Sequence, residues 1–262
     1  MCNLKKKRLF LFDMDGTIYL DDKLFDGTLD ILSHIKSIGG KYIFLTNNSS
    51  KSVDKYIEKL EKLGISSCED DFLTSTNATI SFLLGRGHKK IYALGTASFK
   101  EELKKAGLPI TDTLEEDIDC LLMGFDTELT FKKLEDACIL LNRGVEYIAT
   151  NPDWVCPTWY GYVPDCGSVS TMLYNATKRK PRFIGKPQPD MAQLAMEKAG
   201  YGPQETVLVG DRLYTDIACG VNAGISTVFV LSGEGTLDDL AESEIKPEFV
   251  YENVRRLYED IK

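Results

Sequence analysis

The chain has 262 residues, of which 43% are hydrophobic and 27% charged, as expected of an ordinary globular protein with one large or two modest domains. Its formal charge is −9 (31 − 40), and its one basic block is Lys5 to Arg8. Nucleic acids are therefore unfavoured partners, because phosphate backbones require an extended basic surface. We expect no membrane partner either, since no run approaches the roughly 18 apolar residues of a membrane span.

The seven cysteines are odd in number and scattered, and they include no Cys-x-x-Cys pair. This pattern favours reduced thiols over a disulfide framework or a zinc site, and it indicates a cytoplasmic protein. The basic block and the apolar run after it resemble the start of a signal peptide. The run is too short, however, and ends after four residues at Asp13 and Asp15, so we expect no targeting segment here. The number of subunits stays open, a homo-oligomer included.

The first strong signal is a predicted buried strand over residues 9–12, which stops at Asp13 and Asp15 and is followed by the turn signal Gly16-Thr17. On a continuing strand, residues two apart point the same way. Two such carboxylates repel one another unless a cation lies between them. The fragment alone leaves two interpretations open: a magnesium site at the edge of a parallel sheet, or an acidic turn after a strand.

Helices and strands then alternate along the chain. A helix is predicted over 26–38, a strand over 42–45 and a helix over 53–63, and the same alternation returns with strands over 183–184, 206–209 and 227–231 and helices over 190–199 and 215–222. This order predicts an α/β fold with a doubly wound parallel sheet. From Ser232 onward the chain is acidic, and we expect that segment to be peripheral.

The middle of the chain predicts an inserted second α/β domain. Its strands are expected over 90–94, 120–123 and 145–149, and its helices over 98–106, 131–142 and 167–178. We therefore expect a core formed by residues 1–76 and 181–262, with residues 77–180 as the insertion.

Polar residues follow four predicted strands of the core. They are Asp13 with Asp15, Thr46 with Asn47, Lys186, and Asp211 with Asp216. Each is weak evidence on its own, since such residues commonly cap helices or form turns. The carboxyl ends of parallel strands converge on one crevice, so acidic side chains, a lysine and a hydroxyl are expected to meet there.

These segments resemble the four motifs of the haloacid-dehalogenase-superfamily phosphatases. They read Asp13-Met-Asp-Gly-Thr17, Leu45-Thr-Asn-Asn-Ser49, Ile184-Gly-Lys-Pro187 and Val209-Gly-Asp-Arg-Leu-Tyr-Thr-Asp216. The insertion, with Ala149-Thr-Asn-Pro-Asp153, is similar to the C2-type cap of the class IIA subfamily (NagD-like or p-nitrophenylphosphatase-like). The resemblance covers nearly the whole chain. It departs at Pro164-Asp-Cys-Gly167, where Pro-Gly-x-Gly is expected, and this bears on substrate preference rather than on the chemistry.

The resemblance implies a role for each motif residue. Asp13 would be the nucleophile that forms an aspartyl-phosphate, and Asp15 the general acid and base. Mg²⁺ would be held by Asp13, the backbone carbonyl of Asp15 and Asp211. Asp216 would orient a metal-bound water or Lys186. Thr46 and Lys186 would act in catalysis, and the phosphate or substrate would be bound by Gly16, Thr17, Thr46, Asn47, Asn48, Lys186, Asn151 and Asp153.

The expected function is Mg²⁺-dependent hydrolysis of small phosphomonoesters, of the nucleoside monophosphate or sugar phosphate class. Two alternatives stay open: a phosphotransferase or mutase that uses the same aspartyl-phosphate, and a non-catalytic phosphate-binding module. The second requires the loss of a motif residue, and Asp13, Asp15, Lys186 and Asp211 are all present. Trp154 and Trp159 either pack in a core or form a lip that contacts the leaving group.

Overall fold

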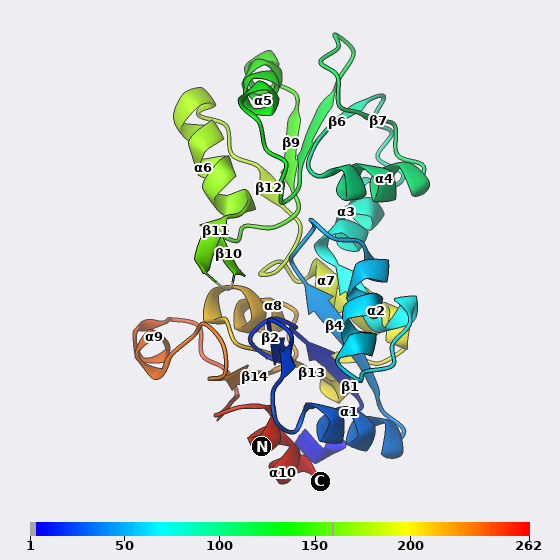
Figure 1. Cartoon of the computed structure of the whole chain (residues 1–262), viewed down its shortest axis with the longest axis vertical. Helices are drawn as coiled ribbons and strands as arrows, with labels where there is room; N and C mark the ends of the chain where they lie inside the picture. Colours follow the sequence, from blue (N-terminus) through cyan, green and yellow to red (C-terminus); the bar gives the residue numbers. More distant parts are fainter. Residues whose placement is uncertain (1–3, 159) are drawn as a thin grey trace. The chain divides into compact units, whose positions relative to one another are not determined.

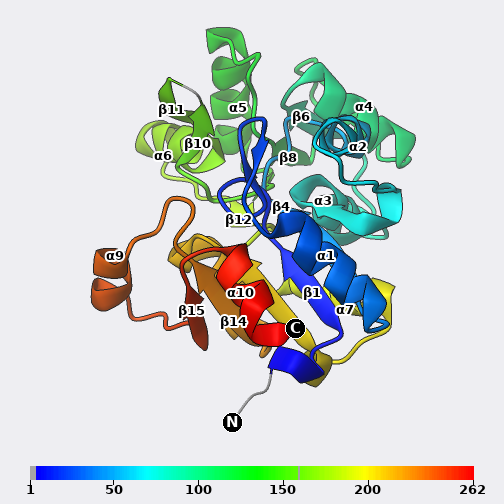
Figure 2. The same ribbon diagram turned by 60° about the horizontal axis from the view of Figure 1, so that its bottom comes forward.

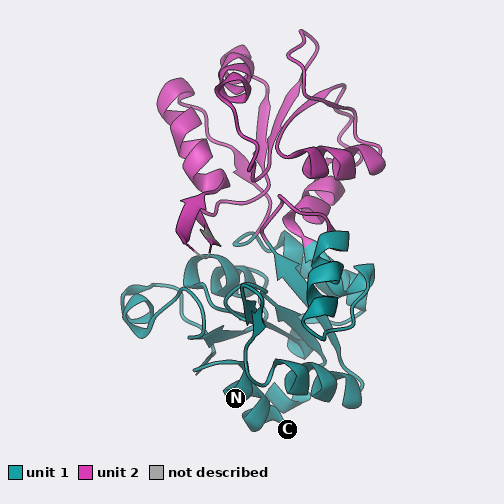
Figure 3. Cartoon of the chain, in the orientation of Figure 1, with its two compact units in different colours: residues 1–46, 53–73, 186–262 teal, residues 47–52, 74–185 magenta. Residues whose placement is uncertain are grey.

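The structure, a computed structural model, describes residues 4–158 and 160–262. The chain divides into two compact units, which are coloured separately in Figure 3. Unit 1 comprises residues 1–46, 53–73 and 186–262, and unit 2 comprises residues 47–52 and 74–185. The short segment 47–52 thus groups with unit 2, although it directly follows a strand of unit 1. Nothing in the sequence pattern indicates this assignment.

Unit 1 is built on a six-stranded sheet in the order β15-β14-β13-β1-β4-β5. Its strands are β1 (Leu9–Phe12), β4 (Lys41–Thr46), β5 (Phe72–Thr74), β13 (Thr206–Gly210), β14 (Ser226–Val230) and β15 (Phe249–Tyr251). Its helices are α1 (Thr28–Ser37), α2 (Val53–Lys62), α7 (Asp190–Ala199), α8 (Ala218–Asn222), α9 (Leu237–Glu242) and α10 (Val254–Ile261), and β2 (Tyr19–Leu20) pairs with β3 (Lys23–Leu24) in a hairpin.

The central strands of unit 1 pair in parallel, and their middle residues are apolar, since both faces of a parallel sheet are covered by helices. On one face, Phe10 and Phe12 of β1 belong to the same buried cluster as Ile31 of α1 and Leu257 of α10. Figure 2 shows α1 and α10 in front of these strands. Helices α7 and α8 contact the strands as well (Figure 1).

Unit 2 has its own sheet of five parallel strands, in the order β12-β9-β8-β6-β7. The strands are β6 (Ile91–Leu94), β7 (Ile110–Thr111), β8 (Cys120–Met123), β9 (Glu146–Ala149) and β12 (Arg182–Phe183), and the helices are α3 (Ser75–Leu83), α4 (Ala97–Lys105), α5 (Phe131–Arg143) and α6 (Cys166–Thr177). An antiparallel hairpin of β10 (Val155–Thr158) and β11 (Gly161–Pro164) precedes α6. The predicted α/β class with a doubly wound parallel sheet is confirmed.

One strand assignment from the sequence is wrong. The segment 183–184 was expected in the sheet of the core, but β12 pairs with β9 in the sheet of unit 2, with Phe183 opposite Ala149. A run of two residues has too little pattern to indicate which sheet it joins. Lys186 therefore reaches unit 1 on the connection between β12 and α7, and not on a strand end of the six-stranded sheet.

None of the helices formed by the described residues combines the length and the apolar character that a membrane span requires.

Helix α6 begins at an unusual buried carboxylate, Asp165, in the segment where the sequence departs from the family pattern. Its Oδ1 accepts a hydrogen bond from the Cys166 N–H at 2.5 Å, and only 3% of the residue is exposed. Burial, followed by the charge of Asp153, raises the pKa of Asp165 to about 7. Ionisation of Asp165 is thus unfavourable in the folded protein. The residue nevertheless supplies the hydrogen-bond acceptor that the start of a helix needs.

Replacing Asp165 with Asn should change how the stability of unit 2 depends on pH. The folded pKa lies above the ordinary value of 3.8, so unfolding releases a proton between that pH and about 7. Wild-type stability should therefore fall as pH rises through this window, by up to about 1.4 kcal/mol per pH unit. Asp165→Asn keeps a capping oxygen and should lack this slope. Denaturant unfolding followed by tryptophan fluorescence measures it, because Trp154 and Trp159 fall in the sequence range of unit 2.

Asp117→Asn, also in unit 2, is the control for this measurement. The Asp117 carboxylate is exposed, and a hydrogen bond from Lys90 lowers its pKa, so its contribution has the opposite sign and is lost as pH falls. Equal pH slopes for wild type and Asp165→Asn would contradict the assignment.

Candidate active site of unit 1

The site forms where the strand order of unit 1 changes direction. From β1 the chain proceeds outward to β4 on one side and later to β13 on the other, so β1 and β13 flank the switch point. Ligands of open α/β sheets bind outside the carboxyl ends of such strands. Asp13 directly follows β1, Asp211 directly follows β13, and the end of β4 places Thr46 on the neighbouring strand.

The buried ammonium of Lys186 joins two of the carboxylates. Its Nζ lies 2.5 Å from Asp13 Oδ1 and 2.7 Å from Asp216 Oδ1, and it donates to the Leu45 carbonyl at 3.1 Å. The lysine is 1% exposed. Burial opposes its charge, but Asp13 and Asp216 outweigh this effect and raise the pKa of Lys186. The lysine is therefore a fixed positive charge beside Asp13.

Three carboxylates meet at this point. Oxygen atoms of Asp13, Asp211 and Asp216 lie within 4.8 Å of one another. Burial is the main cause that raises the pKa of both Asp13 and Asp211 above the usual range, and the neighbouring carboxylates raise it further. With Lys186 the formal charge of the group is −3 + 1 = −2. A divalent cation would neutralise this charge, and oxygen atoms are the ligands that Mg²⁺ prefers.

The three carboxylates are not equivalent as possible metal ligands. Asp216 uses both oxygens inside the protein, since Oδ1 pairs with Lys186 and Oδ2 accepts the Arg212 N–H at 3.1 Å. It lies in a π-helical turn (Leu213–Ile217) that brings it back toward β13. Asp211 Oδ1, by contrast, has a long 3.5 Å contact with the hydroxyl of Thr17. This arrangement favours Asp13 and Asp211 as ligands, with Asp216 as a support.

The side chain of Asp15 lies apart from this cluster. Strand β1 ends at Phe12, and Asp15 belongs to a turn in which the Gly16 N–H donates to the Tyr19 carbonyl at 2.9 Å. The Asp15 side chain is 39% exposed, accepts a hydrogen bond from the Tyr19 hydroxyl at 3.3 Å and lies 3.9 Å from Lys59 Nζ. A proton-transferring group needs such access to solvent or substrate.

Gly16 packs directly against Asp211. Its φ of +91° is a left-handed conformation, and a Cβ at this position would overlap Asp211 Oδ2. Only glycine meets both conditions without strain. Gly16 and the neighbouring Thr17, both predicted to bind phosphate or substrate, thus lie beside Asp211.

Three of the predicted substrate residues in unit 2 are joined to one another. Asn47 Nδ2 donates to Asp153 Oδ1 at 2.9 Å, and Asn151 Nδ2 donates to the Asn47 carbonyl at 2.8 Å. Asn47, Asn151 and Asp153 are all buried. Asn151 and Asp153, which follow β9, thus hold Asn47 in place. In the sequence the three residues are separate candidates, and no local pattern indicates that they form one network.

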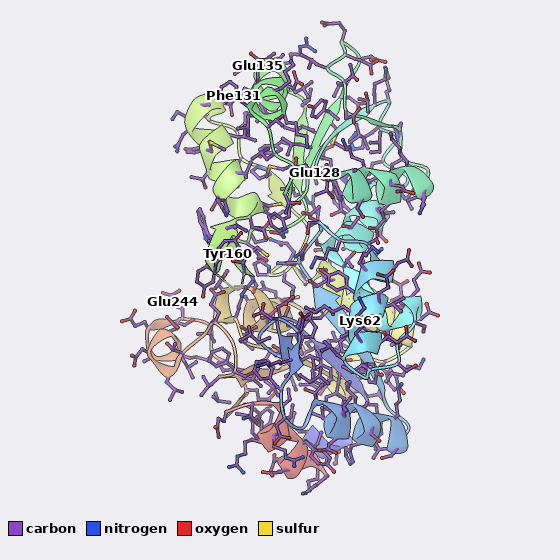
Figure 4. All side chains as sticks on the ribbon, in the orientation of Figure 1. Lys62, Glu128, Phe131, Glu135, Tyr160 and Glu244 are labelled. Carbon is purple, nitrogen blue, oxygen red and sulfur yellow. The ribbon has the colours of Figure 1, made fainter. Side chains whose placement is uncertain are left out.

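A cavity of about 530 Å³ lies within unit 2, which is within the usual range for small-molecule pockets. Asn48, Ser50 and Lys51 line it, together with Gly124 and Phe125 from the end of β8. Another part of its lining comes from the β10–β11 hairpin, whose turn holds the exposed Tyr160 that Figure 4 labels.

The sequence leaves two roles open for the tryptophans: packing in a core, or a lip that contacts the leaving group. Trp154 is 55% exposed, so its side chain does not pack in a core. Trp159 lies outside the described residues.

The expectation that the chain is peripheral from Ser232 onward is wrong for its first residues. The Ser232 hydroxyl donates to the Gly16 carbonyl at 2.7 Å, and the Glu234 N–H donates to Asp211 Oδ2 at 2.7 Å. A Cβ at Gly233 would overlap the Asp211 carboxylate. The signal in the sequence is Ser-Gly-Glu-Gly after a predicted strand, which permits such a close approach of the backbone, but its acidic surroundings obscure it.

Known proteins are similar to this chain in sequence and in fold. Residues 10–109 match the family model of haloacid dehalogenase-like hydrolases, and residues 183–257 match a HAD-hydrolase-like model. The acid sugar phosphatase of Staphylococcus aureus (strain MRSA252) is 30% identical over 260 residues, which cover 99% of this chain and 100% of the relative.

Solved structures agree with this relationship. The 4-nitrophenylphosphatase of Thermotoga maritima is 41% identical, with a TM-score of 0.93 over 99% of both chains. The glycerol phosphate phosphatase of Mycobacterium tuberculosis, solved in complex with magnesium, is 28% identical, with a TM-score of 0.91 over 98% of this chain and 78% of the other. The chain therefore belongs to the NagD-like class IIA branch of the haloacid dehalogenase-like hydrolases and is a phosphatase.

Proposed function

We propose that this phosphatase hydrolyses small phosphomonoesters with the help of Mg²⁺ and through an aspartyl-phosphate on Asp13. The observation that carries the proposal is the position of Asp13, with one oxygen 2.5 Å from Lys186 Nζ and within reach of Asp211. A carboxylate in this position has a fixed cation beside it and a second carboxylate with which to share a metal. Phosphoryl transfer depends mainly on such positioning and on charge neutralisation.

Asp13 and Asp211 would hold the Mg²⁺, together with the backbone carbonyl of Asp15. The donor set fits, because these are hard oxygen ligands beside a group with a formal charge of −2. When bound, the ion would neutralise charge on the phosphoryl oxygens and position them for in-line displacement.

The reaction would proceed in two steps, with Asp13 as the nucleophile and Asp15 as the group that transfers protons. The Asp13 carboxylate attacks phosphorus, a P–O bond forms to Asp13, the ester P–O bond breaks, and the leaving alkoxide takes a proton from Asp15. Asp15, now ionised, removes a proton from a water molecule that attacks phosphorus in the second step. The bond to Asp13 breaks, and inorganic phosphate leaves. Lys186 balances the charge of the free Asp13 carboxylate, and that of the phosphoryl group while it is bound to Asp13.

Thr46 and the residues after it would bind the phosphate oxygens, with the Thr46 hydroxyl and the Asn47 N–H as donors. Asn48 would also bind the phosphate or substrate, as the resemblance of its motif implies. The substrates are expected among sugar phosphates, as the name of the acid sugar phosphatase suggests, and among nucleoside monophosphates.

Asp13→Asn should remove turnover and leave the fold intact. Asparagine has nearly the same shape, but its amide does not attack phosphorus, so kcat for 4-nitrophenyl phosphate should fall by about 10⁴-fold or more. The assay is phosphate release with Mg²⁺, with circular dichroism to verify folding. Asp21→Asn, in the exposed turn between β2 and β3, is the control and should keep wild-type turnover. Substantial residual activity in Asp13→Asn, free of contaminating enzyme, would rule out the nucleophile assignment.

A panel of phosphorylated metabolites should reveal the substrate class and the role of Trp154. Ranked kcat/KM values for sugar phosphates and nucleoside monophosphates identify the preferred ester, and equal amounts of phosphate and alcohol distinguish hydrolysis from phosphoryl transfer to another acceptor. Trp154→Ala should change the ranking several-fold and spare 4-nitrophenyl phosphate. Phe131→Ala, at an 81% exposed position of α5 labelled in Figure 4, is the control. Equal losses on all substrates would instead indicate a structural role for Trp154.

A further inference from the structure

The loop after β14 contacts Asp211 through its backbone at two points. The Glu234 N–H donates to Asp211 Oδ2 at 2.7 Å, and the Gly235 N–H donates to the Asp211 carbonyl at 3.0 Å. The carboxylate and the main chain of the same aspartate are therefore both held by this loop. The orientation of Asp211 depends on where the loop stands.

Glycines on both sides of Glu234 make this approach possible. A Cβ at Gly233 would overlap Asp211, and a Cβ at Gly235 would lie 2.6 Å from the Asp211 carbonyl oxygen. Glycine also brings the greatest conformational freedom to the chain. A loop with two glycines needs another contact to hold one conformation, and Glu234 is the residue between them whose side chain can provide it.

The side chain of Glu234 makes that contact with the residues that follow Asp211. Its Oε2 lies 2.8 Å from Arg212 Nε, and its Oε1 accepts a hydrogen bond from the Tyr214 hydroxyl at 3.2 Å. The side chains are 14% exposed for Arg212 and 30% for Glu234, so solvent screens the pair less than it screens a surface ion pair. Glu234 thus contacts two consecutive residues. Its backbone N–H binds the Asp211 carboxylate, and its side-chain carboxylate pairs with Arg212.

We infer that Glu234 is a positioning residue for the metal site: its ion pair with Arg212 holds the Glu234 N–H against Asp211 Oδ2, which leaves Asp211 Oδ1 for the metal. This inference rests on the proposed function of Asp211 as a magnesium ligand. A group that orients a metal ligand in this way commonly changes metal affinity by about 10- to 100-fold when it is lost.

The inference distinguishes Glu234 from the other acidic residues of the same segment. Asp238, Asp239, Glu242 and Glu244 follow it on and after α9, and Figure 4 labels Glu244 there. The Asp239 carboxylate accepts its described hydrogen bonds from Thr236, at the start of α9. Of the acidic side chains in this segment, that of Glu234 forms the described ion pair with Arg212.

The test is Mg²⁺ binding without substrate, followed by isothermal titration calorimetry and by the shift of the thermal midpoint with MgCl₂. Glu234→Gln keeps an acceptor for Tyr214 and loses the charge opposite Arg212, and we expect the Kd for Mg²⁺ to rise about 5- to 10-fold. Glu234→Ala should raise it about 10- to 50-fold. Glu259→Gln is the matched control, since it removes an ion pair of the same 2.8 Å length with Arg256 on α10, and its Kd should equal that of wild type.

Activity provides a second readout. If Glu234 positions a metal ligand, saturating Mg²⁺ should restore most of kcat in Glu234→Gln. A lower thermal midpoint without metal, combined with wild-type Kd values in both Glu234 variants, would overturn the inference and leave the metal site standing. A wild-type protein that binds no Mg²⁺ would remove the proposed metal site, and the inference with it. If Glu234→Ala does not fold, Glu234→Gln decides the question.

Discussion

The site depends on the contact between the Lys186 ammonium and the carboxylates of Asp13 and Asp216. A buried lysine is costly unless it is paired, and so are buried carboxylates. Each of the three groups therefore needs the others, and they come from segments far apart in the chain: the end of β1, the connection into α7, and the π-helical turn after β13. The packing of unit 1 brings these segments together, and their charges then restrict how they can be arranged.

The same contact explains why the group fits a divalent cation. Lys186 offsets one negative charge of three, and burial makes the remaining charge unfavourable, as the raised pKa values of Asp13 and Asp211 indicate. Asp216 is occupied by the protein itself, whereas Asp211 is held at one oxygen by the loop after β14. The fold thus places carboxylates that look alike in the sequence in different surroundings.

Much of this could be predicted from sequence, and the failures have physical causes. Buried strands such as residues 9–12 can be predicted from their length and apolar composition, and the residues after them lie where the ends of parallel strands converge. The strand at 183–184 was assigned to the wrong sheet because two residues carry no information about their partner strand. The contact of Glu234 with Asp211 was missed because it uses a backbone N–H, which every residue except proline has. The network of Asn47 with Asp153 depends on long-range packing that no local pattern encodes.

Chemical trapping of the intermediate tests the central claim most directly. Turnover of a phosphomonoester would be quenched in acid during the steady state, and the protein reduced with borohydride, which converts an acyl phosphate to an alcohol. Peptide mass spectrometry then locates the residue that carried the phosphoryl group. The account predicts conversion of the aspartate at position 13 to homoserine, dependent on both substrate and Mg²⁺. Conversion at another carboxylate, or none at all in an enzyme that turns over, would contradict it.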